Sequence, residues 1–369
     1  MSEFIERARG LDLQGEMTRR ELMVSLGAIA FAPVLKLAAQ PATPPIPVST
    51  ISHVALTVAD FKRTVDFYQR LFGFSVLTYQ GPPTYRTPGE AETGREYPML
   101  GIPGPRPQFL VLGGGRGAGT TPSINHFCLG VEKFDPDRAA NALKERNIRG
   151  RVRMREGQTP ELLYYDPDGI LFQVQDVSYC GGSGRLGNVC DPKERPFPTS
   201  VSATSPPPNP PLRARTINYF GISVSNFQLS LDFYQGLFGT PIQTYQGETA
   251  LLSIASGPRP QFFAISPGDY RTGKYVAPPS LTAQSPITHF CVGIEGFNAE
   301  RVVKTLAENG VKADLRMREG RTPEVFLWDP DNIRVQIQDV GYCGGSGTLG
   351  SLCNPKDRPL EDARKGVQR

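Results

Sequence analysis

The sequence predicts an α+β fold built from tandem, paired βαβββ modules. First, residues 124–196 align without a gap with residues 287–359, so the chain contains an internal repeat. Second, β-rich runs are followed by single amphipathic helical segments and then by further β-rich runs separated by turn residues. That order indicates strands and hairpins arranged around one helix at a time.

The first module is expected to open with a strand and a helix. The helix begins at Asp60, and Gly73 is placed to end it. The expected elements are a strand at Ile51–Val58, the helix through Phe72, a strand at Phe74–Gln80, and strands around Tyr97–Ile102 and Gln108–Leu112.

The second module repeats this order. Its helix is expected near Pro136–Asn147, and Asp166-Pro167-Asp168-Gly169 forms a turn before the last strand. The expected strands are Ile124–Val131, Gly150–Arg155, Glu161–Tyr165 and Ile170–Val177.

The repeat divides the chain into two domains with a linker between them. We place the first domain at 50–195, a Pro-rich, semi-rigid linker at 196–213 and the second domain at 214–359. Each copy is long enough to bury its own core. Net charge is only +4 and no Lys/Arg-rich stripe interleaves with aromatic residues, which argues against nucleic acid as a partner.

The first 40 residues have the composition of an export signal. Arg19-Arg20 precede an apolar run from Leu22 to Leu35 that is short for a membrane span. The arginine pair predicts a twin-arginine signal, a periplasmic or secreted protein, and no stable membrane anchor once the signal is removed. The alternative is a disordered N-terminal arm.

Two Gly-rich segments are each bracketed by cysteines, Cys180 with Cys190 and Cys343 with Cys353. In an oxidising compartment each pair could close a short disulfide loop. Crossed pairing between the copies and free thiols are the alternatives. The spacing is poor for zinc without a nearby histidine.

All three histidines of the chain fall in β-rich runs. His126 and His289 occupy matching positions of the repeat, and His53 lies in the first strand. Neutral imidazole is the commonest metal ligand in proteins, so this placement favours a metal site. The alternative is a set of core histidines with hydrogen-bonded rings.

The ordered set of motifs resembles the vicinal oxygen chelate superfamily, which includes glyoxalases, extradiol dioxygenases and bleomycin-resistance proteins. The shared features are the strand-helix opening, the Asp-Phe-Tyr-x-x-Leu-Phe-Gly helix at 66–73 and the Asp-Pro-Asp-Gly turn at 166–169. The resemblance covers residues 50–178 and 214–341. It implies two cupped mixed sheets, each formed by paired modules around a divalent metal.

Carried over by position, the resemblance implies that His53, His126 and Gln173 are the metal ligands of the first copy. Gln173 stands where many members of the family have Glu. The second copy has Tyr219, His289 and Gln336 at these positions, so we expect a metal in the first copy and leave open whether the second binds anything.

Tyr164 and Tyr165 precede the Asp-Pro turn, and one of them is expected to point into the cup. A tyrosine there could donate a proton to a ligand oxygen, and we assign both as candidate catalytic residues. The alternative is an aromatic lid on the core. The repeated pair Arg153 and Arg155 is expected to form structural salt bridges with Glu156 or Glu161.

These observations predict an exported, metal-dependent enzyme that acts on a small substrate with adjacent oxygens. The reaction is dioxygenase- or glyoxalase-like, or a lyase or isomerase reaction. The metal is a divalent transition ion (Fe, Mn, Zn or Cu). The alternative is a non-catalytic periplasmic protein that sequesters a ligand. Because the chain contains both halves, it can act as a monomer or as a homodimer.

Overall fold

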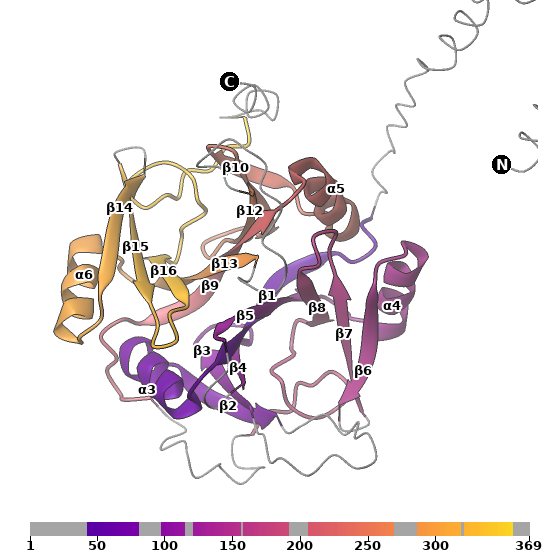
Figure 1. Cartoon of the computed structure of the whole chain (residues 1–369), viewed down its shortest axis with the longest axis horizontal. Coiled ribbons are helices and arrows are strands. Elements are labelled where there is room, and N and C mark those ends of the chain that lie inside the picture. Colours follow the sequence, from indigo (N-terminus) through magenta and orange to yellow (C-terminus); the bar gives the residue numbers. More distant parts are fainter. Residues whose placement is uncertain are drawn as a thin grey trace, which may run out of the picture. The chain divides into compact units, whose positions relative to one another are not determined.

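The computed structural model describes residues 43–80, 97–114, 121–155, 158–191, 206–268, 286–318 and 321–356. Within these residues the chain forms two eight-stranded mixed sheets and four helices. The predicted α+β fold of tandem βαβββ modules is confirmed, with one sheet for each copy of the repeat (Figure 1). In this part of the chain, no helix combines the length and hydrophobicity needed to cross a membrane.

The first sheet has the strand order β2-β3-β4-β1-β5-β8-β7-β6. Its first module consists of β1 (Val48–Val58), α3 (Phe61–Phe72), β2 (Ser75–Gln80), β3 (Tyr97–Ile102) and β4 (Gln108–Gly114). Its second module consists of β5 (Ser123–Val131), α4 (Pro136–Glu145), β6 (Gly150–Arg155), β7 (Thr159–Tyr165) and β8 (Leu171–Asp176).

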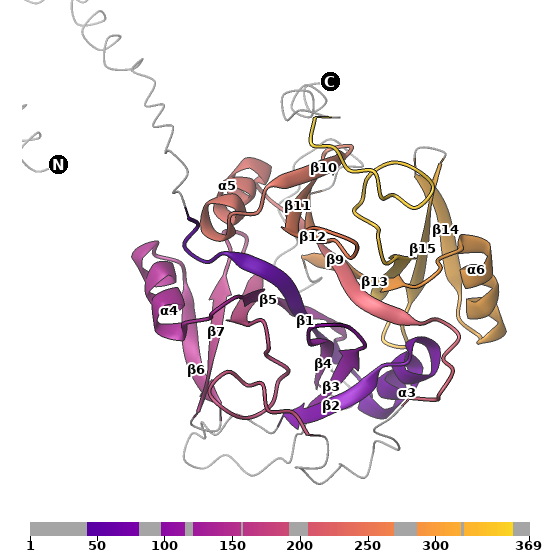
Figure 2. The same ribbon diagram turned by 180° about the vertical axis from the view of Figure 1, so that it is seen from behind.

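The second sheet repeats this order as β10-β11-β12-β9-β13-β16-β15-β14 (Figure 2). Its first module consists of β9 (Ala214–Val224), α5 (Phe227–Phe238), β10 (Ile242–Gln246), β11 (Thr249–Ala255) and β12 (Gln261–Pro267). Its second module consists of β13 (Ile287–Ile294), α6 (Ala299–Glu308), β14 (Ala313–Arg318), β15 (Thr322–Trp328) and β16 (Arg334–Asp339).

The first helix of each copy has matching caps at both ends. Asp60 accepts a hydrogen bond from the Arg63 N–H, and Asn226 caps α5 in the same way. Gly73 and Gly239 end these helices with φ of 76° and 71°, a left-handed conformation that favours glycine. The start at Asp60 and the end at Gly73 predicted for the first helix therefore agree with the structure, whereas α4 ends at Glu145, two residues before the predicted Asn147.

The first strands of the two modules lie side by side in the middle of each sheet. β1 pairs antiparallel with β5, and each runs parallel to the last strand of its own module. Side chains alternate between the two faces of a strand, so this register brings residues from β1, β5 and β8 onto one face. We call the face that carries His53, His126 and Gln173 the first cup, and the face that carries Tyr219, His289 and Gln336 the second cup.

The two copies share one hydrophobic core on the faces opposite the cups. The Phe127 and Phe220 rings stack across the copies with centroids 4.0 Å apart, and Phe172 packs against Phe233 and Phe238 of α5. Each copy is long enough for a core of its own, but in the structure the two copies contribute to one core. Two helices of 12 and 10 residues cover only part of an eight-stranded sheet, so elements of the other copy cover the rest.

The two Asp-Pro turns bind the first helix of the opposite copy. Asp329 accepts a hydrogen bond from the Tyr68 hydroxyl at 2.9 Å, and Asp331 accepts one from Thr64. In the reciprocal contact, Asp166 accepts a hydrogen bond from the Tyr234 hydroxyl at 2.8 Å. Residues that read locally as a hairpin turn thus join the two copies.

Both Gly-rich segments are closed by disulfides, Cys180–Cys190 and Cys343–Cys353. The prediction of short disulfide loops is confirmed, and crossed pairing and free thiols are excluded for these four cysteines. Cys128 and Cys291 are free and buried. We call residues 180–190 and 343–353 the two hooks.

The end of the predicted linker is packed against the protein. Leu212 is buried, and its backbone N–H donates to the Leu71 carbonyl at the end of α3. The earlier linker residues up to 205 and the predicted export segment at 1–40 lie outside the described residues.

Candidate functional site

Three side chains converge in the middle of the first cup. The Nε2 atoms of His53 and His126 lie 3.3 Å apart, and His126 Nε2 lies 3.2 Å from Gln173 Oε1. Each comes from a different strand, β1, β5 or β8, and the strand register brings them together. The structure therefore unites the three residues that the sequence assigned as ligands.

The hydrogen bonds around this set leave lone pairs directed at its centre. Asn125 Oδ1 lies 2.8 Å from His126 Nδ1, so we assign the ring proton to Nδ1 and a lone pair to Nε2. At most one proton, on His53, is then available among the three converging atoms. The buried Nε2 of Gln173 has no hydrogen-bond partner among the described residues. The orientation of this amide is therefore not set by the hydrogen bonds of the described protein groups.

Burial keeps both histidines neutral. Burial, together with the nearby His126 and Arg155, holds the pKa of His53 well below its usual range. Burial lowers the pKa of His126 to about 4, and the charge of Arg153 adds to the effect. His53 is buried, whereas His126 is only partly buried, so the set is reached from the His126 side. Neutral imidazoles at one open edge are suited to metal ligation.

An apolar wall surrounds His53. The ring stacks on Phe109 with centroids 4.7 Å apart, and Tyr179 lies 5.8 Å away. Met99 completes this buried cluster. Sequence analysis missed Tyr179 as a cup residue, although its recurrence as Tyr342 was a visible signal. Because Tyr342 lies beside Tyr219 in the second cup as well, the recurrence indicates a structural role.

A charged cluster ties the hook to the floor of the cup. Glu161, which is 1% exposed, forms salt bridges with Arg153 and Arg155 and accepts a hydrogen bond from Tyr179. Arg155 also donates to the Gly181 carbonyl in the hook. The second copy repeats the cluster around Glu324. The structural salt bridges predicted from the sequence are confirmed, with Glu161 as the partner.

The described residues show no hydrogen bond or ring contact between either tyrosine proposed as catalytic and the ligand set. In the β7–β8 register Leu163 lies opposite Gln173, whereas Tyr164 lies opposite Phe172 and packs into the shared core. Tyr165 lies at the end of the strand, where Arg149 stacks 4.6 Å over its ring. Strand alternation places Tyr164 on the face opposite the cup. The catalytic roles of Tyr164 and Tyr165 both stay predictions.

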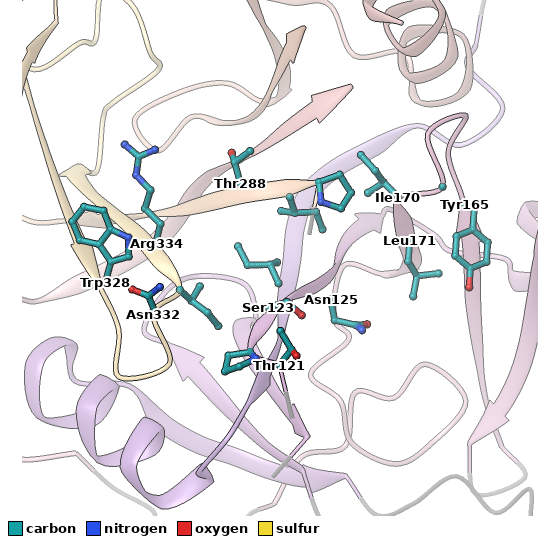
Figure 3. A pocket seen from close by; sticks show the side chains of 16 residues that line it. Thr121, Ser123, Asn125, Tyr165, Ile170, Leu171, Thr288, Trp328, Asn332 and Arg334 are labelled. Carbon is teal, nitrogen blue, oxygen red and sulfur yellow. The ribbon is translucent and has the colours of Figure 1, made fainter. Parts of the chain in front are cut away.

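Tyr165 lines a cleft of about 750 Å³ between the two copies. Figure 3 shows Ser123, Asn125 and Tyr165 on one side and Thr288, Trp328 and Arg334 on the other. Trp328 and Tyr165 occupy equivalent positions of the repeat. The cleft is thus lined by corresponding residues of both copies.

The second cup replaces the ligand set with a closed hydrogen-bond chain. Thr288 Oγ1 lies 2.8 Å from His289 Nδ1, and His289 Nε2 lies 2.9 Å from the Tyr219 hydroxyl, which donates to Gln336 Oε1. Burial raises the pKa of Tyr219 well above its usual range, so the phenol keeps its proton. The atoms that would bind a metal are therefore already hydrogen-bonded.

The comparisons with known proteins agree with this architecture. Residues 50–174 match the model of the Glyoxalase/Bleomycin resistance protein/Dioxygenase superfamily. The match covers most of the first copy, and the second copy repeats the same fold. A search of the curated proteins found no match.

Solved structures show the same fold at low sequence identity. The 2,3-dioxygenase LapB from Pseudomonas sp. KL28 is 14% identical with a TM-score of 0.54, covering 85% of this chain and 96% of that chain. The Mn(II)-bound glyoxalase from Novosphingobium aromaticivorans is 14% identical, with a TM-score of 0.52 and coverage of 85% and 86%. Homoprotocatechuate 2,3-dioxygenase from Arthrobacter globiformis is 13% identical, with a TM-score of 0.51 and coverage of 82% and 83%.

Proposed function

We propose that this protein is a metal-dependent enzyme whose active site is the first cup. The observation that carries the proposal is the convergence of His53 Nε2, His126 Nε2 and Gln173 Oε1 at 3.3 and 3.2 Å. Ligands on one face of an ion with bonds of about 2.1 Å lie about 3 Å apart. The donor set therefore fits a divalent transition metal such as Fe, Mn, Zn or Cu.

The amide of Gln173 gives the set a particular preference. A carboxylate at this position would contribute a negative charge, whereas His53, His126 and Gln173 are all neutral ligands. A bound divalent metal would supply Lewis acidity and hold two adjacent substrate oxygens. Because the protein adds no negative charge to the set, an anionic substrate such as a catecholate or an enediolate is favoured.

The chain's own residues shape the rest of the site. Phe109, Met99 and Tyr179 form an apolar wall on which a small ring can pack and from which water is excluded. Beneath them, Glu161 forms salt bridges with Arg153 and Arg155 and offsets one of their two positive charges. The open edge at His126 admits the substrate.

Two reaction classes remain within this proposal, a dioxygenase-like and a glyoxalase-like reaction. The fold resembles solved structures of a dioxygenase and of a glyoxalase, which supports both reaction classes and does not favour either one. The third histidine of the chain, His289, lies in the other cup. A ring cleavage that needs another histidine for proton transfer would have none in the first cup, which favours lyase or isomerase chemistry.

A second candidate function is ligand binding without chemistry. The observation in its favour is a cavity of about 650 Å³ in the second cup, whose ligand positions are closed by hydrogen bonds. A protein that sequesters small molecules would need such cavities and no metal.

We further propose that the protein is exported in folded form to the periplasm or beyond. The two disulfides support an oxidising compartment. The arginine pair at 19–20 supports a twin-arginine signal. Replacing both arginines by lysine should leave the protein in the cytoplasm of its host, which cell fractionation would detect.

Elemental analysis of protein purified from its host tests the enzyme proposal directly. We expect about one equivalent of a transition metal for each chain. Gln173→Glu should tighten its binding by about tenfold or more, because a carboxylate replaces a neutral amide. His289→Ala is the matched control, since it removes a histidine from the other cup and should leave the metal content unchanged. The proposal would be contradicted if the native protein contains no metal and Gln173→Glu binds added metal no more tightly than the wild type.

A further inference from the structure

We propose that the second cup is a binding site for a small aromatic carboxylate, distinct from the ligand set of the first cup. Its cavity of about 650 Å³ is of the size that proteins use for small molecules. The rings of Tyr219, Phe262 and Phe326 line it and provide an apolar surface for a planar ligand. Tyr219 and Phe262 are themselves stacked, with centroids 4.5 Å apart.

Three arginines, Arg316, Arg318 and Arg334, line the same cavity. The first two form salt bridges with the buried Glu324. Arg334 has no ion pair with a carboxylate among the described residues. Among the residues that line the cavity, the three arginines outnumber the one acidic side chain, Glu248.

The hydrogen-bond groups left over in this cavity are donors. The Nε of Arg334 and the Nε2 of Gln336 are buried and have no partner among the described residues, and Gln336 is only 1% exposed. Neither atom can accept a hydrogen bond. Leaving such donors unpaired costs free energy, and a ligand that offers acceptor oxygens removes that cost. A carboxylate offers two oxygens and the opposite charge.

Phe326 holds two of the guanidinium groups over its ring. Arg334 lies 3.9 Å and Arg316 5.3 Å from the ring centroid. Burial lowers the pKa of Arg334, and the nearby charge of Arg316 contributes to the shift. Two like charges held close together at a cavity wall are stabilised by an anion placed between them.

The first copy lacks these features. Leu171 takes the place of Arg334, and Leu163 takes the place of Phe326. The arginines paired with Glu161 and Glu324 are common to both copies, so they do not account for the difference. The second copy combines an added cation with the loss of one candidate metal ligand, His53, to Tyr219. This exchange converts a cation-binding arrangement into an anion-binding one.

The single tryptophan provides a reporter for the test. Trp328 pairs with Arg334 in the strand register, so its fluorescence should respond to a ligand at this site. We would titrate the full chain with benzoate and, separately, with benzamide, which has the same shape without the charge. Saturable binding of benzoate, at least about tenfold tighter than benzamide and weakened by salt, is expected.

Arg334→Leu restores the residue of the first copy and should weaken benzoate binding about 10- to 100-fold. Arg321→Leu is the matched control, since it removes the same charge from an exposed position outside the cavity and should leave binding unchanged. His126→Ala should also leave it unchanged. Absence of saturable benzoate binding, equal affinity for benzamide, or full affinity in Arg334→Leu would each overturn the proposal.

Discussion

The two cups differ in chemistry although they share a scaffold. Both have the same strand order, the same Arg-Glu-Tyr cluster and a disulfide-closed hook. In the first cup the lone pair of His126 Nε2 faces the lone pairs of Gln173 Oε1. In the second cup one phenol joins the corresponding histidine and glutamine. The two sets differ at one position. With His53 the set of the first cup has lone pairs available for a cation, whereas with Tyr219 the atoms of the second set are already hydrogen-bonded to one another.

The largest effect is expected from His53→Tyr, which gives the first cup the side chain of the second. The phenol should hydrogen-bond to His126 and Gln173. Metal affinity should fall by more than about 100-fold, because the change removes a metal ligand itself, and losing a residue that only hydrogen-bonds to a ligand already costs about 10- to 100-fold. Elemental analysis after dialysis measures this loss. Tyr219→Phe is the control and should keep the metal. Full metal content in His53→Tyr would break the comparison.

The reciprocal change, Tyr219→His, should open the second cup. It creates a His-His-Gln set on the same register as the first cup, and the hydrogen-bond chain through Tyr219 is lost. We expect a second equivalent of metal, bound more weakly than the first because Arg334 and Arg316 lie nearby. Isothermal titration calorimetry with the metal would show whether the variant has one site or two. A single site would mean that other residues around Tyr219 also prevent metal binding in the second cup.

The contacts between the copies are unequal as well. Asp331 is buried and accepts hydrogen bonds from the Ala59 N–H, Arg63 and Thr64, whereas Asp168 is partly exposed and bonds to Ser225 and Ser230. Asp331→Ala should lower the free energy of unfolding by about 3 kcal/mol, and Asp168→Ala by about 1 kcal/mol. Urea denaturation compares the two variants, and equal losses would contradict this ranking.

Asp166 and Asp329 should make stability depend on pH. Burial raises the pKa of each carboxyl group to about 6. In the unfolded chain the value is about 3.9, so the folded state retains these protons longer. Their contribution is present below about pH 4 and is lost as pH rises to about 6, on the order of 2 kcal/mol for each group.

Urea denaturation between pH 4 and pH 7 measures this effect as the difference between the wild type and Asp166→Asn/Asp329→Asn. The asparagines cannot ionise, so the variant should lack that part of the decline. Parallel curves would show that the two carboxyl groups titrate normally.

The smallest effect concerns the two interface helices. Gly236 lies inside α5, where α3 has Arg70, and nothing lies within 4 Å of a Cβ added there. Gly236→Ala should raise the free energy of unfolding by about 0.5–1 kcal/mol, since glycine is unfavourable within a helix. Thermal unfolding detects it, with Arg70→Ala as the control at the matching position. A loss of stability would indicate a contact that needs glycine at this site.

Much of the fold could be read from local patterns. The alternation of β-rich runs and the caps at Asp60 and Gly73 predicted the modules and the first helix, because these signals act within a few residues. The resemblance to a known superfamily placed His53, His126 and Gln173 at its metal-ligand positions. Their convergence then followed from the strand register. The two disulfides were anticipated because each cysteine pair closes a short loop.

Other features depended on surfaces that meet only in the folded chain. The sequence did not reveal that Asp329 binds Tyr68 of the other copy, that Tyr164 faces the shared core, or that Arg334 lines the second cup. The alternation of side chains along a strand shows which residues share a face. It does not show which of the two faces is covered by an element far away in the sequence. Which groups are excluded from water together, and hence which donors stay unpaired, is settled by tertiary packing because the partners lie far apart in the chain.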